Sequence, residues 1–380
     1  MIYLDNSATT AALPQVVTAM NRMLTVDYGN PSSLHNMGLA AEKVIVAARR
    51  QVAAPIGARP AEIYFTSGGT EATNWALWGL ARARRRQGRH IITTAIEHPA
   101  TLAACRFLQT EGYEVTILPV NSRGIVEPDE LAKALRPDTI LVSVMSVNNE
   151  LGSLQPIKEI ARLVRSKSEA ALHVDHVQGY GKIALNCREL DIDLMSLSAH
   201  KIHGPKGCGA LYIKKGLRLE PLLLGGGQEN GQRSGTENTP AIAGFGVAAG
   251  QAVLDFAERN SKMRAIKLEL AARLLEAIPG TLINGPTPEE GAPHILNVSF
   301  PGVRAEVLVH MLAERGIYVS TGSACHSRQR EASHVLKAIK LEPQRLESAI
   351  RISLGVFNTA TEIDPTVAAL QECVAELRNL

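Results

Sequence analysis

The first two-thirds of the chain alternate between short apolar runs, rich in residues that favour strands, and longer stretches with helical periodicity. The apolar runs occupy residues 90–96, 113–120, 139–147, 171–175, 194–199 and 208–213. Helical candidates lie between them, for instance over 99–112, 127–136 and 156–168. This alternation is typical of a mostly parallel sheet covered by helices on both faces. The sequence therefore predicts an α/β fold.

A second, smaller domain is expected, because 380 residues exceed what one hydrophobic core usually serves. The pattern of apolar and charged residues changes after residue 256, which predicts that this domain begins there. A long charged helix is expected over about 257–278, followed by strand–helix–strand elements and a last helix over 361–377. The expected division is an N-terminal segment, 1–15, that packs with the small domain, a large domain, 16–256, and a small α+β domain, 257–380.

Composition argues against nucleic acid or a membrane as the main partner. Lys and Arg number 40 and Asp and Glu 37, which leaves a formal charge of only +3. No 18-residue stretch is free of charges or helix breakers, and MIYLDNSATT carries no targeting pattern. Five scattered cysteines with no C-x-x-C pair fit reduced thiols rather than disulfides or a zinc site. We therefore expect a cytoplasmic protein without a metal.

Three polar motifs follow apolar runs, where ligands gather in an open α/β sheet. In FTSGGTEATNWAL (65–77), Thr70 opens a helix whose N-terminus suits a phosphate, although an ordinary N-cap explains the motif equally well. No dinucleotide or P-loop glycine pattern occurs. In LHVDHVQGYGK (172–182), Asp175 ends a buried strand, and we favour a cofactor or structural role over a metal.

The third motif, SLSAHKIHGPKGCGAL (196–211), places Lys201 at a strand end, where a desolvated amine would become a Schiff-base nucleophile. Alone, it is better interpreted as a surface lysine. Together, a phosphate cup, a carboxylate for a pyridinium proton and a strand-end lysine are the attachments that pyridoxal phosphate requires. His98 would stack on its ring.

Cys325 lies among small and polar residues in STGSACHSR (320–328), whereas cysteine is usually buried. The question is therefore what a cysteine does in a segment that looks exposed.

The sequence as a whole resembles the cysteine desulfurases, pyridoxal-phosphate enzymes of the class V aminotransferase superfamily, close to the NifS and IscS branch. The motifs that carry the resemblance run nearly end to end in family order: YLDNSATT, YGNPSSLH, FTSGGTEATN, EHPA, NNELG, HVDHVQ, SAHKIHGPKG, GGGQENGQRSGT, PHILNVSF, STGSACHS and IRISLG.

The resemblance implies the type I fold of pyridoxal-phosphate-dependent transferases, with a mainly parallel seven-stranded sheet in the large domain. It also implies a homodimer, in which Thr236 reaches the phosphate of the neighbouring subunit. Asp175 would pair with the pyridine nitrogen and Gln178 with the phenolic oxygen. The implied cofactor-binding residues are Gly69, Thr70, His98, Asn149, Asp175, Gln178, Ser198, His200, Lys201 and Thr236.

For catalysis the resemblance implies roles for Lys201, His98 and Cys325. The cofactor would form a Schiff base on Lys201, and Asn149 with Arg351 would hold the substrate carboxylate. The Cys325 thiolate would take the sulfur of L-cysteine, leave L-alanine, and carry the persulfide on a mobile loop to an acceptor protein, an iron–sulfur scaffold or a tRNA-thiolation enzyme.

Two alternatives stay open at this point. A selenocysteine lyase, or another class V lyase or aminotransferase, would share the lysine and aspartate without needing Cys325. A non-catalytic assembly protein would keep the fold as a binding platform. His176, at a position usually small in the family, is interpreted as a packing residue rather than an acid–base group.

Overall fold

The computed structural model describes residues 1–321 and 333–379, so Cys325 lies outside the described residues. Its larger sheet has seven strands in the order β2-β8-β7-β6-β5-β3-β4. Only β8 runs antiparallel to its neighbours. The predicted α/β class and the mainly parallel seven-stranded sheet are therefore confirmed. The strands are β2 (Ile63–Thr66), β3 (His90–Thr94), β4 (Glu114–Leu118), β5 (Thr139–Met145), β6 (Ala171–Asp175), β7 (Leu194–Ser198) and β8 (Gly209–Ile213).

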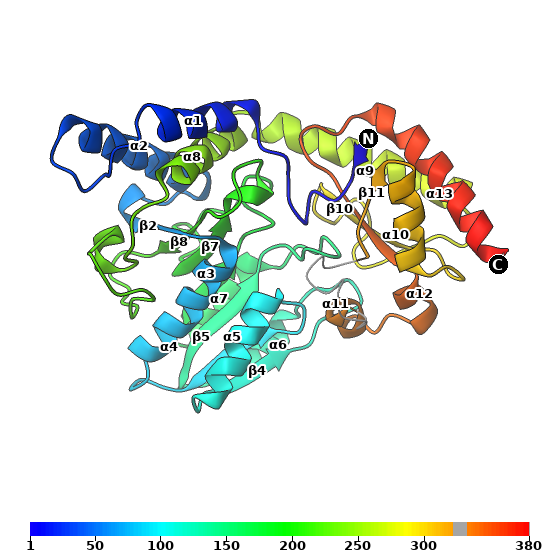
Figure 1. The fold of residues 1–380 in the computed structure, drawn as a ribbon. Helices are drawn as coiled ribbons and strands as arrows, with labels where there is room; N and C mark the ends of the chain where they lie inside the picture. The colour runs from blue at the N-terminus through cyan, green and yellow to red at the C-terminus, as the bar shows by residue number, and fades with distance from the viewer. Residues whose placement is uncertain (322–332, 380) are drawn as a thin grey trace.

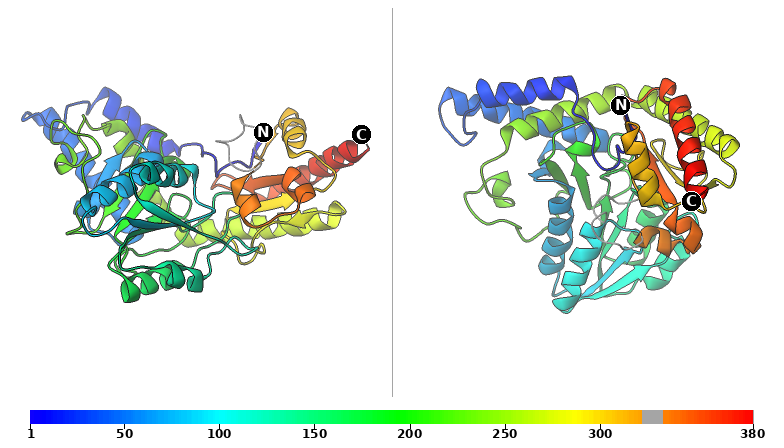
Figure 2. Two further views of the ribbon diagram at one scale, coloured as in Figure 1. Left: turned by 90° about the horizontal axis from the view of Figure 1, so that it is seen from below. Right: turned by 45° about the vertical axis from the view of Figure 1, so that its right-hand side comes forward.

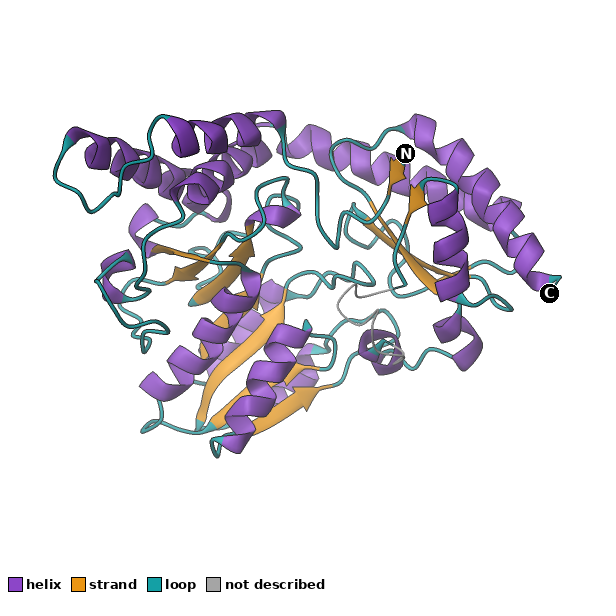
Figure 3. Ribbon diagram, viewed as in Figure 1, coloured by secondary structure: helices purple, strands orange, loops and turns teal. Residues whose placement is uncertain are grey.

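Helices cover both faces of this sheet (Figures 1 and 3). Successive strand residues point to opposite faces, so Val142 packs in one core and Leu141 in the other. The first core involves α1 (Pro14–Thr25), α2 (Asn36–Ala53), α6 (Pro128–Ala134), α7 (Ile157–Lys167) and α8 (Thr239–Leu254). The second involves α3 (Gly69–Asn74), which continues through a π-helical turn (Trp75–Gly79) into α4 (Leu80–Ala83), and α5 (Pro99–Thr110).

A smaller antiparallel sheet of three strands lies beside the larger one in Figure 1, with its own apolar core. Its strands, in the order β12-β10-β9, are β9 (Leu282–Ile283), β10 (Ile295–Ser299) and β12 (Ala349–Ser353). Its helices are α9 (Phe256–Ala277), α10 (Ala305–Glu314) and α13 (Ile363–Arg378), with the short α11 (His334–Ala338) and α12 (Pro343–Glu347) nearby. Figure 2 shows α9 running along this part of the molecule.

The N-terminal segment crosses between the two sheets. Strand β1 (Ile2–Tyr3) pairs in parallel with β11 (Ile317–Tyr318), and Leu4 belongs to the core of the smaller sheet. The N–H of Thr10 bonds to the carbonyl of His200, beyond the end of β7. The first ten residues therefore lie against both parts of the chain, at the place where the candidate site is found.

None of the helices in the described part of the chain is, by itself, long and apolar enough to cross a bilayer. Helices α8 and α9 meet that criterion only when they are counted together, and a bend of 77° separates them.

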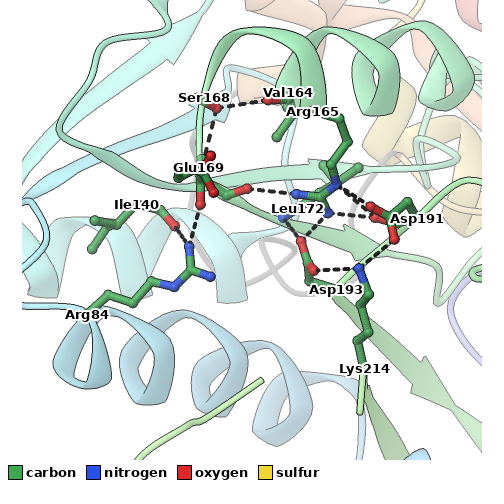
Figure 4. A network of polar contacts seen from close by, with 11 residues as sticks. Arg84, Ile140, Val164, Arg165, Ser168, Glu169, Leu172, Asp191, Asp193 and Lys214 are labelled. Carbon is green, nitrogen blue, oxygen red and sulfur yellow. Dashed lines mark hydrogen bonds and ion pairs between the residues drawn. The ribbon is translucent and has the colours of Figure 1, made fainter. Parts of the chain in front are cut away.

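An ion-pair network holds the starts of β6 and β7 to α7 and to the end of β8 (Figure 4). Asp193 accepts the N–H of Leu172 at 2.7 Å and pairs with Arg165, while Lys214 lies 3.6 Å from its other oxygen. The Asp193 side chain is only 9% exposed. Asp191 binds the same two cations, but half of its side chain is exposed to water.

Asp193→Ala should therefore lower the free energy of unfolding by about 2–4 kcal/mol, because the buried N–H of Leu172 would lose its acceptor and the Arg165 guanidinium its buried carboxylate partner. Asp191→Asn is the control and should cost under about 1 kcal/mol, since its ion pairs are exposed to solvent and Asn tolerates the left-handed backbone (φ 52°) at this position. Urea unfolding of both variants measures the difference. Equal losses would show that the buried position of Asp193 is not what matters.

Candidate active site

A cavity of about 220 Å³ lies at the carboxyl ends of β5, β6 and β7. Parallel strands bring the residues that follow them to one edge, which is why distant motifs converge here. Thr236 lines a neighbouring cavity with Ser67 and Gly207, and Cys325 falls outside the described residues. The other ten predicted site residues all line the first cavity: Gly69, Thr70, His98, Asn149, Asp175, Gln178, Ser198, His200, Lys201 and Arg351.

Lys201 ends a 3₁₀ turn (Ala199–Lys201) that directly follows β7. Its amine donates to the carbonyl oxygens of Ser7 and Ala8, the latter at 2.8 Å. The side-chain amide of Gln178 donates to the same Ser7 oxygen at 2.9 Å. The N-terminal segment thus forms one wall of the cavity, and the sequence motifs did not reveal that role for Ser7 and Ala8.

Asp175 is the last residue of β6 and is almost completely buried. Burial raises the pKa of its carboxyl from 3.8 to about 6, although the Val177 N–H that it accepts at 3.0 Å and the nearby Lys201 charge both act to lower it. Because desolvation outweighs these contacts, the carboxylate has capacity for a further cationic partner. A protonated heterocyclic nitrogen would provide one.

Other residues that line the cavity offer hydrogen-bond donors. Gly69 and Thr70 occupy the first turn of α3, and the Ser198 hydroxyl is buried with no partner among the described residues. Burial, aided by nearby lysines, lowers the pKa of His200 to about 3, so its imidazole is neutral. Unsatisfied buried hydroxyls are rare in folded proteins, and a phosphate bound by this turn would satisfy Ser198.

His98 is held in a defined orientation as the N-cap of α5. Its Nδ1 accepts the N–H of Ala100 at 3.1 Å, so in the neutral ring the proton sits on Nε2. The ring lines the same cavity as Asp175 and Lys201. An aromatic ring fixed in this way suits stacking against a planar ligand.

Arg351 reaches the cavity from β12 of the smaller sheet and is only 1% exposed. It donates to the Asn149 carbonyl at 3.0 Å and to an Asp5 oxygen at 2.6 Å. Its Nε is buried and has no partner among the described residues. The guanidinium therefore keeps a donor available for an anionic group such as a carboxylate.

The histidines of the H-x-D-H motif have structural partners. His173 lies 2.8 Å from the Ser143 hydroxyl and 2.9 Å from that of Ser196. His176 lies 2.8 Å from the Ser146 hydroxyl, and its ring contacts the edge of Tyr180. Burial lowers the pKa of both imidazoles to about 3, which favours the packing interpretation of His176 over an acid–base role.

The sequence did not predict a role for Glu97, although this residue directly precedes His98. It is fully buried, and one oxygen accepts the Thr94 hydroxyl at 2.7 Å and the Met145 N–H at 2.9 Å, which joins the ends of β3 and β5. Burial raises its pKa from 4.5 to about 8. An acidic residue immediately after an apolar strand was the signal that could have identified it.

The raised pKa of Glu97 has a consequence for stability. The folded protein holds this proton up to about pH 8, whereas the unfolded chain releases it near pH 4.5, so stability should fall as pH rises between these values. Glu97→Gln should remove up to about 1.4 kcal/mol per pH unit of that loss. Urea unfolding at pH 6, 7 and 8 tests this, with the exposed Glu347→Gln as control. Identical slopes for wild type and Glu97→Gln would contradict it.

Comparison with known proteins adds independent evidence to this geometry. The family model described as aminotransferase class-V matches residues 2–365. The chain belongs to this family. Membership implies the type I fold and, in general, dependence on pyridoxal phosphate, for which the lysine, the buried carboxylate and the orphaned donors of the cavity fit. Sequence reasoning that rested on eleven motifs in order thus identified the family correctly.

Similar members of the class V family carry informative names. A protein of Methanosarcina thermophila named cysteine desulfurase IscS is 45% identical over 379 residues, which cover 100% of this chain and 93% of that protein. A cysteine desulfurase of a Nostoc species is 44% identical, with 100% and 94% covered. The solved structure of a NifS-like protein superposes with a TM-score of 0.93 at 41% identity and 99% coverage of each chain. The structure titled SspA in complex with cysteine gives 0.83 at 34% identity, covering 94% of this chain and all of that one.

Proposed function

We propose that the protein is a cysteine desulfurase. The observation that carries the proposal is the convergence in one cavity of Lys201, Asp175 and Arg351, which lie in three different elements. The first two suit a pyridoxal phosphate, and the third suits the carboxylate of an amino acid. The names of the relatives at 44–45% identity, and a similar protein solved with cysteine, support this substrate.

Pyridoxal phosphate, when bound, supplies a carbonyl carbon for amines and a ring that stores electrons. We propose that Lys201 holds it as a Schiff base, and that Asp175 keeps the ring nitrogen protonated. Gln178 is assigned to the phenolic oxygen, because it lines the cavity and its side-chain amide can donate a second hydrogen bond beside the one to Ser7. Gly69, Thr70, Ser198 and His200 are assigned to the phosphate, and His98 to stacking on the ring.

The substrate end is assigned to Asn149 and Arg351. The Arg351 guanidinium would bind the α-carboxylate of L-cysteine, which places Cα toward Lys201. The Lys201 amine lines the same cavity, and we propose that it would take the Cα proton once the cofactor has released it.

Cys325 is proposed as the sulfur acceptor. Its thiolate would attack the sulfur of the substrate, so that an S–S bond forms as the Cβ–S bond breaks. The electron pair of the broken bond stays with the carbon skeleton, which takes up protons to become L-alanine, and the enzyme keeps a persulfide. No external oxidant is consumed. The four described cysteines, Cys105, Cys187, Cys208 and Cys373, are buried, which argues against them for this role.

The assembly around the site is proposed on the same basis. Thr236 would complete the phosphate site of a second copy in a homodimer, and the persulfide would pass to an acceptor protein in iron–sulfur or tRNA sulfur supply. A large domain over 16–256 and a small one over 257–380, with 1–15 packed on the latter, remain our division of the chain. Reduced, buried thiols fit a cytoplasmic location.

Cys325→Ala in the cofactor-loaded protein should abolish sulfide release from L-cysteine under reductant, while the absorption band of the bound cofactor stays. Lys201→Ala should lose both turnover and the Schiff-base band. Absorption spectroscopy and sulfide assay measure the two properties. Unchanged turnover of Cys325→Ala would refute the desulfurase mechanism and favour another class V lyase.

A further inference from the structure

Ser333 begins the second described part of the chain and contacts a residue adjacent to the candidate substrate site. Its hydroxyl donates to Oε2 of Glu150 at 2.5 Å and accepts the N–H of Leu336, so it also caps α11. Glu150 is 1% exposed, and its Oε1 has no partner among the described residues. The Ser333 hydroxyl is therefore a principal contact of a buried carboxyl group.

Glu150 lies in a turn that is fixed on several sides. Arg351 binds the carbonyl of Asn149, and Asn297 of β10 donates to the carbonyl of Glu150 at 3.2 Å. The Asn148 amide donates to the carbonyl of Ile96 at 2.9 Å, which attaches the turn to the segment that carries His98. A contact with Glu150 is thus a contact with a rigid support of the cavity wall.

A second contact acts beside the first. Nε2 of His334 lies 2.9 Å from the carbonyl oxygen of Glu97, so this nitrogen carries the donated proton. Ser333 and His334 are consecutive, while Glu97 and Glu150 directly adjoin His98 and Asn149. The start of α11 is consequently attached to both segments that face the substrate, through one side-chain and one backbone acceptor.

We propose that Ser333 is a positioning residue for sulfur transfer. By binding Glu150, it fixes the start of α11 relative to Asn149 and Arg351. Ser333 follows Cys325 by eight positions in the sequence, so this contact fixes the residue at which the segment that carries Cys325 ends. The inference rests on the proposed role of Cys325. It concerns the transfer of sulfur to the thiol and leaves binding of L-cysteine to the residues already assigned.

Three substitutions separate this role from helix capping alone. Ser333→Thr keeps both the cap and the hydroxyl for Glu150. Ser333→Asp keeps a good N-cap but places a second carboxylate against the buried one. Ser333→Ala loses both contacts. Ser348→Ala is the matched control, because within the described part of the chain that buried hydroxyl bonds only to the carbonyls of Gln344 and Arg345, in its own helix region.

The cofactor-loaded variants are mixed with L-cysteine in a single turnover. The spectral change of the cofactor reports substrate binding, and mass spectrometry reports the persulfide on Cys325. Ser333→Ala and Ser333→Asp should slow persulfide formation about tenfold or more, because misplacement by about 1 Å costs that much or more. The Kd for L-cysteine, read from the spectral change, should alter less than about twofold. Ser333→Thr and Ser348→Ala should stay within about twofold of wild type.

Hydrogen exchange on the cofactor-free protein gives a readout independent of turnover. Residues 334–338 should exchange faster in both Ser333→Ala and Ser333→Asp, and at the wild-type rate in Ser333→Thr. A Ser333→Asp variant that matches wild type in persulfide rate would overturn the positioning role, as would an equal loss in Ser348→Ala. Persulfide that persists on another residue in Cys325→Ala would instead overturn the proposed function.

Discussion

The candidate site depends on a guanidinium that is buried at the meeting point of three segments. Arg351, on β12, cannot be placed in the interior without partners, because an uncompensated buried charge is strongly unfavourable. Its partners are Asp5, in the N-terminal segment, and the carbonyl of Asn149, in the turn after β5. The two sheets and the first residues of the chain must therefore come together for this charge to be tolerated, and the same meeting encloses the cavity.

The sequence predicted the buried parallel strands well, because strands covered on both faces are short and continuously apolar. The run 171–175 coincides with β6, and 90–96 overruns β3 by only two residues. The direction of an individual strand could not be predicted, because the apolar run that becomes β8 does not indicate that β8 is antiparallel. The pairing of β1 with β11 could not be predicted either, since each of these strands has only two residues and so shows no periodicity.

Site residues were predictable where a side chain carries the chemistry at a strand end, as for Asp175 and Lys201. The contacts that organise them were not. Lys201 binds backbone carbonyls of residues more than 190 positions away, and a carbonyl leaves no mark in the sequence. Glu97 was overlooked because an acidic side chain usually indicates a solvated position. The geometry around Cys325 stays a prediction, because it lies outside the described residues.

The N-terminal wall of the cavity also constrains the order in which the protein matures on the ribosome. All strands of the larger sheet lie within residues 63–213, so that sheet has its complete sequence well before β11 and β12 are synthesised. Asp5 can form its ion pair only after Arg351, 346 positions later, has been synthesised. Likewise, Ile2 can pair with β11 only after Ile317 has been synthesised. Residues 2–5 can therefore take their final places only after β11 and β12 have been synthesised, and closure of so long a loop is entropically slow. Competence to hold a cofactor would then arise only after the chain has been synthesised as far as Arg351.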